Sequence, residues 1–325
     1  MRSSRILVTG GAGFIGSNVV DACLAEGHDV AVVDDLSTGS SANVPAAARL
    51  YRMDIRSAEL HDVFRRERPE IVSHHAAQIS VARSVEDPML DAAVNVLGSL
   101  NVLEAARRHG VRRVVFASSG GAIYGEPDRP AADEGHACRP RSPYAVAKLA
   151  VEHYLDGYRA TAGLESVALR YANVYGPRQD PRGEAGVIAV FIDAIRAGRT
   201  PIIYGDGEQI RDFVYVGDVV RANLAAQART LASHEPVAFN IGTGHGTSVN
   251  ALWRALATIA DSPSKPRHEP ARAGDLLRSV LDPRLAREVL GWTAEMDLVS
   301  GLRRTWDWFA SRTDAAETWR PSLSR

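Results

Sequence analysis

The sequence predicts an α/β fold, in which a doubly wound parallel β-sheet carries a smaller C-terminal region. Short apolar runs alternate with amphipathic helical stretches through the first half of the chain, and such alternation produces parallel sheets with helices on both faces. The alternation becomes less regular after Gly176, where the stretches GPRQDPRGEAG and SPSKPRHEPARAGD carry the loops of the smaller region.

The expected strands are short apolar runs bounded by polar or turn residues. They cover residues 6–8, 29–33, 70–74, 113–117 and 165–171. The expected helices of the first half cover residues 15–26, 60–66, 89–109 and 143–161. Near the C-terminus, Leu302, Trp306 and Phe309 recur at helical spacing, which predicts a helix packed on the core.

The composition is that of an ordinary globular protein and excludes several classes of function. Lys and Arg number 38 against 39 Asp and Glu, so the charge balance does not indicate nucleic acid or an anionic membrane as a partner. Two cysteines, Cys23 and Cys138, are too few for a disulfide framework or a thiolate metal site. No run approaches the ~18 apolar residues of a membrane span, and the N-terminus lacks a signal-peptide core. We therefore expect a cytoplasmic protein without a metal.

A glycine-rich turn connects the first expected strand to the first expected helix. In the segment ILVTGGAGFIG, Gly10, Gly13 and Gly16 permit a tight turn, and the helix N-terminus offers amides and a positive dipole end to a pyrophosphate. A purely structural turn is the alternative, but the strand, turn and helix context favours a Rossmann-type dinucleotide site. The next strand ends at Asp34, 18 residues after Gly16. Carboxylates at Asp34 and Asp35 would bind a ribose and repel a 2′-phosphate, which favours NAD over NADP.

The segment SPYAVAK sets Tyr144 four residues before Lys148, on one face of an expected helix. An adjacent ammonium lowers the pKa of a phenol, so the pair can act as a base. A core-facing tyrosine beside a solvated lysine is the alternative for an isolated pair. Context decides, because the strand before this helix runs into SSGGAIYG and delivers Ser118 or Ser119 to the same edge of the sheet.

At this point the sequence resembles the extended short-chain dehydrogenase/reductase family, and within it the UDP-glucose and UDP-N-acetylglucosamine 4-epimerases. The resemblance extends over about residues 5–300. The motifs that carry it are GGAGFIG, HHAAQISVARSVEDP, NVLGSLNVLEAAR, SSGGAIYG, SPYAVAK, LRYANVYGPRQ, YGDGEQIRDFVYVGD, NIGTG and RAGD. So many motifs in order are specific for the family and less specific for the substrate.

The resemblance implies a role for residues at the matching positions. Tyr144 is implied as the catalytic base, Lys148 as the residue that lowers its pKa and holds the nicotinamide ribose, and Ser119 as the hydroxyl that binds the sugar O4. Ser119 is preferred to Ser118 because it precedes Tyr144 by 25 residues, the family's usual interval. The implied cofactor-binding positions are Gly10, Gly13, Phe14, Ile15, Gly16, Asp34, Asp35, Leu36, Ser37, Thr38, Gly39, Asp54, Ile55, Ala76, Ala77, Gln78, Asn95, Ser118, Tyr144, Lys148 and Tyr171.

A second set of positions is implied to bind the nucleotide sugar. Arg211 and Arg272 resemble the family's diphosphate-binding arginines, and a forked guanidinium suits that anion. A surface salt bridge would be the ordinary interpretation of each arginine alone, and the motifs around them reverse it. The implied substrate-binding positions are Ser119, Gly120, Gly121, Tyr144, Asn173, Val187, Tyr204, Arg211, Arg272, Asp275 and Ser279.

Two glycines indicate which reaction of the family to expect. Related dehydratases carry an Asp and a Glu directly after the strand-end Ser/Thr, because removal of water needs a further acid and base. Here Gly120 and Gly121 stand in those places, so we expect 4-epimerisation of a UDP-hexose through a transient 4-keto sugar. A UDP-glucuronate 4-epimerase or another enzyme that modifies nucleotide sugars is the alternative. A non-catalytic NAD-binding sensor is disfavoured because the Tyr144 and Lys148 pair is intact.

The resemblance also bears on specificity and assembly. Ser279, seven residues after Arg272, occupies a position that is small in relatives that accept N-acetylated sugars. An Asn that precedes IAVFI in well-known relatives is missing, which leaves the nucleotide open. We expect an NAD-binding domain at 1–176 with a returning segment at about 212–242, and a nucleotide-sugar-binding domain at 177–211 and 243–325. The helices at 89–109 and 143–161 resemble those of the family's homodimer interface.

Overall fold

The computed structural model describes residues 3–181, 186–229, 237–272 and 274–312. A seven-stranded sheet forms its centre, and every neighbouring pair of strands in it is parallel. In spatial order the strands are β10 (Ala238–Ile241), β6 (Glu165–Tyr171), β5 (Arg113–Ser119), β4 (Ile71–His74), β1 (Arg5–Thr9), β2 (Asp29–Asp34) and β3 (Arg49–Arg52). The predicted doubly wound parallel sheet is confirmed, since the chain moves outward from β1 in both directions.

Two strands of this sheet were not expected from the sequence. β3 is the edge strand RLYR, which is only four residues long and whose end arginines are exposed, so it lacks an apolar run. β10 comes from a distant part of the chain and pairs with β6 at the other edge. Period and apolar content identify central strands well, and they identify short edge strands poorly.

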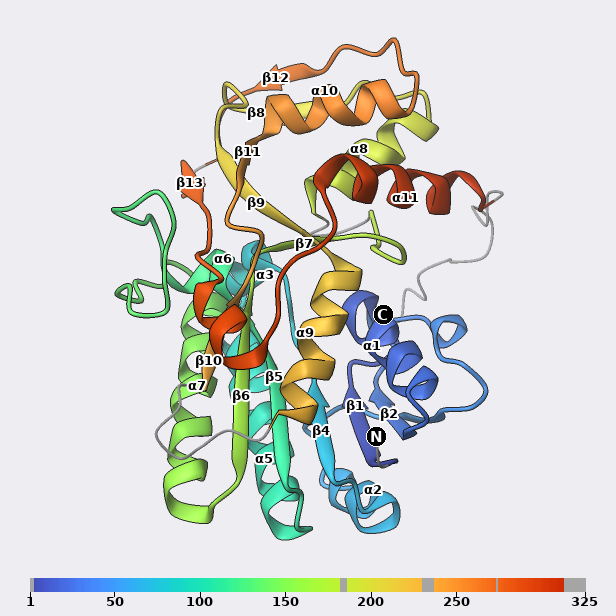
Figure 1. The fold of residues 1–325 in the computed structure, drawn as a ribbon, viewed down its shortest axis with the longest axis vertical. Coiled ribbons are helices and arrows are strands. Elements are labelled where there is room, and N and C mark those ends of the chain that lie inside the picture. Colours follow the sequence, from blue (N-terminus) through green and yellow to red (C-terminus); the bar gives the residue numbers. More distant parts are fainter. Residues whose placement is uncertain (1–2, 182–185, 230–236, 273, 313–325) are drawn as a thin grey trace.

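Helices cover both faces of the sheet (Figure 1). On one face Leu7 packs in a core with the apolar sides of α2 (Leu60–Glu67), α5 (Gly98–Arg108) and α7 (Pro143–Ala162). On the other face, α1 (Phe14–Ala25) and α9 (Val216–Ala228) pack against each other and against the sheet. Neighbouring residues of β1 enter different cores because strand side chains alternate between faces.

The helix expected at 89–109 is a continuous helical run that joins α4 (Pro88–Ala92), a π-turn at Ala93–Leu97 and α5. By length and composition this run, Pro88–Arg108, could span a membrane, and 44% of its 18-residue apolar stretch is buried inside the protein. This corrects our expectation that no stretch is long enough, because a window average tolerates the two carboxylates that interrupt the apolar run. Core helices meet the same criteria, so the finding is weak evidence for a membrane.

The helix that carries SPYAVAK has well-formed ends. The Ser142 side chain caps the N-terminus of α7 by accepting from the Ala145 amide, and Pro143 occupies the first turn. Gly163 ends the helix in the left-handed region at φ 66°. These ends fix the start of α7, and with it the face that Tyr144 and Lys148 share.

The remaining elements form a smaller region beyond the α3 and α6 end of the sheet (Figure 1). In it β9 (Ile210–Tyr215) pairs with β7 (Asn173–Tyr175), β11 (Gly246–Ser248) and β13 (Arg278–Ser279), and β8 (Ile202–Tyr204) pairs with β12 (Arg267–Glu269). Its longer helices are α8 (Val187–Arg196), α10 (Val249–Ile259) and α11 (Leu298–Ala310). Leu302 and Phe309 are buried between these helices and Trp306 packs against the same core, which confirms the predicted C-terminal helix. The short elements of the chain are α3 (Val81–Glu86), α6 (Gly120–Ile123), a 3₁₀-turn at Ser41–Asn43 and a second π-turn at Ala286–Leu290.

Candidate active site

The glycine turn between β1 and α1 is tightly closed. The Gly10 amide donates to Val33 O at 2.8 Å, and the Gly13 amide donates to Gly10 O at 3.2 Å. Gly10 has a φ of 68°, and a Cβ on Gly16 would collide with the Gly10 carbonyl oxygen. Gly13 provides no side-chain cap for α1, and the first turn of this helix carries no acidic residue. The turn therefore leaves backbone amides and room for a pyrophosphate, which fits a dinucleotide.

Asp34 lies at the end of β2, directly beside this turn. Its carboxylate accepts from the Ala12 amide at 2.9 Å and from the Leu36 amide at 2.8 Å, and burial raises its pKa. The following residues fold back over the turn, because the Ser40 amide donates to Ala12 O and a Cβ on Gly39 would come within 2.9 Å of Ala12. The predicted positions 34–39 thus gather around the glycine turn.

The segment after β4 closes the cofactor side of the site. The Ala76 amide lies within 3.3 Å of Thr9 Oγ1, and a Cβ on Gly10 would approach Ala76 N to 2.6 Å. Asn95, in the π-turn, accepts from the Gln78 amide and donates to the Gln78 carbonyl, both at 2.9 Å. Its predicted supporting role therefore has a structural basis, since the side chain fixes the course of the segment at Gln78.

Other predicted cofactor residues have partners of their own. Asp54 forms a 2.6 Å ion pair with Arg56, which holds the pKa of the carboxyl below its usual range. The Ile55 side chain is buried in the core, against Gly98. The buried Tyr171 hydroxyl accepts from Asn223 at 2.8 Å.

Ser119, Tyr144 and Lys148 meet at the carboxyl end of β5. Lys148 is 4% exposed, donates to Ala117 O at 2.9 Å, and lies 4.8 Å from the ring centre of Phe116 and 5.8 Å from that of Tyr144. Tyr144 is partly exposed and hydrogen-bonds with the Ser119 side chain. A pocket of about 260 Å³ opens beside them. Its lining includes Phe14, Ile15, Ser118, Ser119, Tyr144, Tyr171, Asn173, Gln179 and Val187.

The ionisation of this cluster differs from the expectation. Desolvation raises the pKa of Tyr144 to about 12, the Ser119 hydrogen bond opposes this shift, and Asp91 adds to it. Desolvation lowers the pKa of Lys148 to about 8, against the opposing effects of Asp91 and Glu152. We expected Lys148 to lower the pKa of Tyr144, but in the chain without ligands the effect of burial is larger.

The two neighbouring histidines at the end of β4 contact different groups. His74 hydrogen-bonds with Thr9 at 2.6 Å and with Ser99 at 2.9 Å, whereas His75 hydrogen-bonds with Ser73 at 3.0 Å. Burial, together with the positive charge of Lys148, lowers the pKa of each histidine to about 3. Both are therefore neutral near pH 7, and within the described ranges no His, Cys, Asp and Glu cluster could hold a metal.

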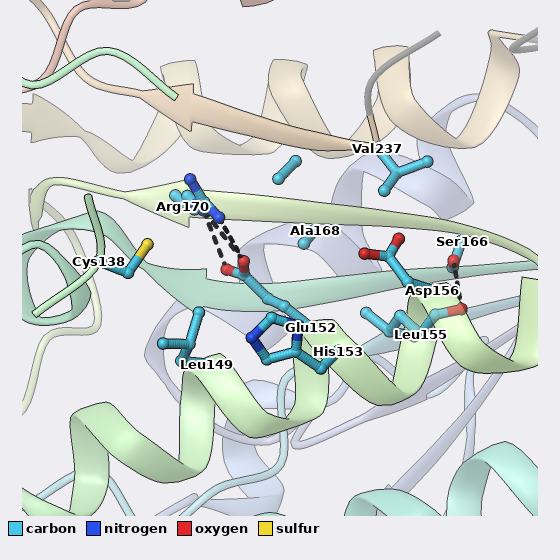
Figure 2. A pocket seen from close by; sticks show the side chains of 11 residues that line it. Cys138, Leu149, Glu152, His153, Leu155, Asp156, Ser166, Ala168, Arg170 and Val237 are labelled. Carbon is cyan, nitrogen blue, oxygen red and sulfur yellow. Dashed lines mark hydrogen bonds and ion pairs between the residues drawn. The ribbon is translucent and has the colours of Figure 1, made fainter. Parts of the chain in front are cut away.

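Ser118 faces away from this cluster. Its hydroxyl donates to Glu152 at 2.5 Å, and Glu152 forms a 2.6 Å ion pair with Arg170. Figure 2 shows this pair, with Arg170 on β6 directed at Glu152 on α7, beside a second pocket of about 290 Å³. This larger pocket contains none of the predicted catalytic residues. Because the Ser118 hydroxyl already donates to Glu152, the predicted contact of Ser118 with the cofactor would have to involve other atoms of this residue.

The predicted sugar-binding residues converge from three segments. A Cβ on Gly121 would lie 3.9 Å from Asn173 Oδ1 and 4.0 Å from Ser279 Oγ. Ser279 is buried and pairs with Arg211 in register between β13 and β9. A Cβ on Gly120 would lie 2.5 Å from Leu281 Cδ1, so no larger side chain fits there without movement.

The predicted diphosphate-binding residues lie in the smaller region. Arg211 forms a 2.5 Å ion pair with Asp275, and the Arg272 guanidinium stacks 3.9 Å from the ring centre of Tyr204. The pocket beside Tyr144 is not lined by any of these four residues.

Three residues near the site were not identified from the sequence. Gln179 lines the pocket with a buried Oε1 that has no partner among the described residues. Glu152 stands four residues after Lys148, so helical spacing could have placed it on the same face. Asp91 acts electrostatically on Lys148 and Tyr144, and no local pattern reveals this because α4 and α7 are far apart in the sequence.

Comparison with known proteins agrees with this geometry. Residues 6–242 match the NAD dependent epimerase/dehydratase family. The UDP-glucose 4-epimerase of Mycolicibacterium smegmatis is 46% identical over 314 residues, which cover 95% of this chain and 99% of that protein. The crystal structure of UDP-glucose 4-epimerase from Thermotoga maritima with UDP-glucose is 47% identical and has a TM-score of 0.91, covering 94% of this chain and 98% of that one.

A third similar protein has a different sugar in its name. The structure of UDP-N-acetylglucosamine 4-epimerase from Methanobrevibacter ruminantium, in complex with UDP-N-acetylmuramic acid, is 34% identical with a TM-score of 0.89. It covers 96% of this chain and 99% of that one. The glycine turn, the Ser119, Tyr144 and Lys148 cluster, and these similarities together show that the chain belongs to the NAD dependent epimerase/dehydratase family, within the extended short-chain dehydrogenases/reductases.

Proposed function

We propose that this protein is a UDP-sugar 4-epimerase that interconverts UDP-glucose and UDP-galactose with NAD bound at the glycine turn. The observation that carries the proposal is that Ser119 and Tyr144 line one pocket, with the buried Lys148 beside the Tyr144 ring and glycines at the two positions after Ser119. The similarity to UDP-glucose 4-epimerases over almost the whole chain supports the same activity.

We propose a role for each of these side chains, based on the family resemblance. Tyr144 accepts the proton of the sugar 4-hydroxyl, and the Ser119 hydroxyl, which hydrogen-bonds with Tyr144, supports that transfer. NAD supplies the acceptor and donor for the hydride at C4 and, when oxidised, a positive charge beside the pocket. Lys148 adds a second positive charge and is held by Ala117 O. Arg211 and Arg272 hold the diphosphate, so that the oxidised sugar can turn and present its other face.

The glycines after β5 argue against dehydration. An additional acid and base would have to stand at positions 120 and 121. Leu281 leaves no room for a side chain at Gly120, and the space beside Gly121 is shared with Asn173 and Ser279. The site therefore supports only the proton transfer at one hydroxyl that epimerisation needs.

We also propose that the sugar pocket admits an acetamido group. Gly121 and Ser279 are small, and the Ser279 hydroxyl lies at the edge of the space next to Asn173. Ser279→Tyr is expected to abolish turnover of UDP-N-acetylglucosamine while reducing that of UDP-glucose by less than about tenfold, an energy of about 1.4 kcal/mol. The measurement is kcat/KM for both sugars, with Ser279→Ala as the control that keeps the pocket small. Equal loss of both activities would place Ser279 outside the sugar pocket.

The two-domain organisation remains a proposal that the packing supports. We assign an NAD-binding domain to 1–176 with the returning segment at about 212–242, and a nucleotide-sugar-binding domain to 177–211 and 243–325. The pairing of β10 with β6 and the packing of α9 on α1 support the return of the chain to the first domain.

We also propose a homodimer through α7 and the helical run of α4, the π-turn at Ala93–Leu97 and α5. α3, α4, the π-turn at Ala93–Leu97 and α7 pack against one another. They expose six large apolar side chains: Val81, Val85, Met89, Leu97, Val146 and Tyr154. Exposed apolar patches of this kind are typical of protein interfaces. A second copy is the expected occupant because the helices resemble the family's dimer helices. Val146→Glu should then yield monomers in light scattering of the eluted protein, and a wild-type monomer would contradict the proposal.

The decisive experiment is incubation of the purified protein, without added reductant, with UDP-glucose, UDP-N-acetylglucosamine or UDP-glucuronate. Proton NMR should show the C4 epimer of the first sugar, and of the second if the acetamido proposal holds. Conversion of UDP-glucuronate alone would replace the hexose proposal by the uronate alternative. No conversion in the presence of bound NAD would favour a sensor and contradict the proposed activity.

A further inference from the structure

Asp91 is a buried carboxylate that the reaction proposed above does not use. It lies on α4, and its side chain is 1% exposed. One oxygen, Oδ1, accepts from Gln78 Nε2 and from Asn95 Nδ2, both at 2.9 Å. The other oxygen, Oδ2, is buried and has no hydrogen-bond partner in the described part of the chain. A buried carboxylate with a free oxygen is costly unless a nearby positive charge compensates it.

The positive charge that acts on Asp91 is Lys148, although no ion pair joins these two described residues. α4 packs against α7, and Asp91 is the first of the two carboxylates that favour the protonated form of Lys148. Burial raises the pKa of Asp91, and the hydrogen bonds from Gln78 and Asn95 and then the positive charge of Lys148 oppose this shift. The charged residues of α3, which packs on both helices, are the exposed Arg83 and Glu86.

The other titratable groups near Lys148 do not supply this compensation. His74 and His75 on β4 are neutral near pH 7. Tyr144 retains its proton, since its pKa is about 12. Glu152 on α7 already forms a 2.6 Å ion pair with Arg170, with two further hydrogen bonds between the two groups, both at 3.1 Å. Glu152 and Arg170 therefore neutralise each other, and Asp91 remains as the unmatched negative charge.

We propose that Asp91 is the counter-charge of Lys148, and that it acts as a positioning residue that keeps the ammonium charged beside Tyr144. It acts through Lys148 and does not touch the reacting atoms. The same carboxylate fixes Gln78 and Asn95, so one residue links the segment after β4 to the charge on α7. Its kinetic consequences rest on the proposed epimerase activity, and its effect on stability does not.

The first test is the pH profile of Asp91→Asn. The amide oxygen can replace Oδ1 as the acceptor for Gln78 and Asn95, while the amide nitrogen replaces the free oxygen, so mainly the charge is lost. Without that charge, Lys148 loses its proton at lower pH and Tyr144 is easier to deprotonate. We expect both limbs of the kcat/KM profile for UDP-glucose to move to lower pH, by roughly one pH unit.

The matched control is Asp87→Asn, four residues earlier in the chain. Asp87 is exposed and caps α4 by accepting from the Leu90 amide, a role that Asn fills equally well. This variant removes the same charge without changing the surroundings of Lys148, and its profile should coincide with that of the wild type. A profile of Asp91→Asn that also coincides with the wild type would overturn the proposal, and so would a loss of activity that is uniform at every pH.

The second test measures stability and needs no activity. Lys148→Met leaves Asp91 as an uncompensated buried charge, and Asp91→Asn leaves Lys148 as an uncompensated buried charge. Each single variant should therefore melt several degrees below the wild type at pH 7. The double variant contains neither charge and should melt above at least one single variant, which makes the two effects non-additive. It should fold even if Asp91→Asn alone does not. Additive losses would show that Asp91 is not the partner of Lys148.

The two tests separate this proposal from the proposed function. If the protein lacks epimerase activity but the stability effects are non-additive, the charge pair is supported and the proposed reaction is contradicted. If the protein is an active epimerase but the losses of melting temperature are additive, the proposed reaction is supported and the charge pair is contradicted.

Discussion

Two tyrosines lie beside a cation in this protein, one at the proposed active site and one at a neighbouring position. Tyr144 accompanies Lys148, whose Nζ is 5.8 Å from the ring centre, and Tyr124 accompanies Arg170, whose guanidinium carbon is 5.3 Å from the ring centre. Desolvation raises the pKa of both phenols. The chemical groups are similar, so what distinguishes the two sites is how completely their hydrogen bonds are satisfied.

At Tyr124 every group has a partner. Its hydroxyl accepts from Arg170 Nη1 and donates to Asn240 Oδ1, both at 2.8 Å, and Asn240 Nδ2 donates to the Ala132 carbonyl at 2.9 Å. Glu152 completes the network through Arg170 and Ser118. A fully satisfied buried network stabilises one arrangement of the chain.

Near Tyr144 several buried polar groups lack hydrogen-bond partners. Within the described residues Asp91 Oδ2, His75 Nδ1 and Gln179 Oε1 are buried without hydrogen-bond partners. Tyr144 remains partly exposed to the pocket, unlike Tyr124, which is 2% exposed. In this protein, the tyrosine and cation pair proposed for the reaction is the one whose neighbouring groups lack hydrogen-bond partners.

The largest expected effect separates the two tyrosines by activity. Tyr144→Phe should lower kcat for UDP-glucose by about 10³-fold or more, because the base of the reaction is lost. Tyr124→Phe should keep kcat within about threefold and reduce the free energy of unfolding by about 1–3 kcal/mol, since Asn240 Oδ1 loses its donor. Steady-state kinetics and urea denaturation of both variants measure this. Comparable activities of the two variants would remove the distinction between the sites.

The next effect tests the satisfied network directly. Glu152→Gln removes the partner of Arg170 and leaves a buried positive charge, which should cost about 3–5 kcal/mol of unfolding free energy. Glu104→Gln, at a half-exposed carboxylate on α5 that also binds an arginine, is the control and should cost less than about 1 kcal/mol. If urea denaturation gives equal losses of unfolding free energy for both variants, burial of the ion pair between Glu152 and Arg170 does not increase its effect on stability.

The two adjacent serines provide a smaller contrast. Ser119→Ala should reduce kcat about 10- to 100-fold, because Tyr144 loses a hydrogen bond that favours its ionised form. Ser118→Ala should leave kcat nearly unchanged and lower the unfolding free energy by about 1 kcal/mol, since only the bond to Glu152 is lost. The reverse result would exchange the roles of the two hydroxyls.

The smallest effect is the dependence of the wild type on pH. Burial has lowered the pKa of Lys148 to about 8, so its ammonium loses its proton as the pH rises through that value. The active form needs an ionised Tyr144 and a charged Lys148, and the pKa of Tyr144 lies above that of Lys148. The kcat/KM for UDP-glucose, which reports ionisations of the free enzyme, should therefore rise with pH to about 8 and then level off, because further ionisation of Tyr144 is offset by loss of the Lys148 charge. Arg170 remains charged throughout this range, so the melting temperature should not follow the same curve. A kcat/KM that keeps rising about tenfold per pH unit up to pH 10 would show that the Lys148 charge is not required.

Local patterns predicted much of the fold and of the candidate site. The glycine turn, Asp34 at the end of β2, and the shared face of Tyr144 and Lys148 all depend on residues that are close in sequence. The choice of Ser119 over Ser118 came from family spacing and stays a prediction; in the structure the Ser118 hydroxyl donates to Glu152, whereas Ser119 lies beside Tyr144. The edge strand β3 was missed because RLYR lacks an apolar run.

The sequence by itself therefore determined the type of fold and the cofactor class, and it provided the residues that we propose for the chemistry. Only the tertiary structure decided their electrostatics. Burial keeps the pKa of Tyr144 high, Arg170 forms an ion pair with Glu152, and the charge of Asp91 acts on Lys148. These effects depend on desolvation and on distances between helices and strands that are far apart in the chain. Helical and strand periodicity extends over only a few residues, so no local pattern contains that information.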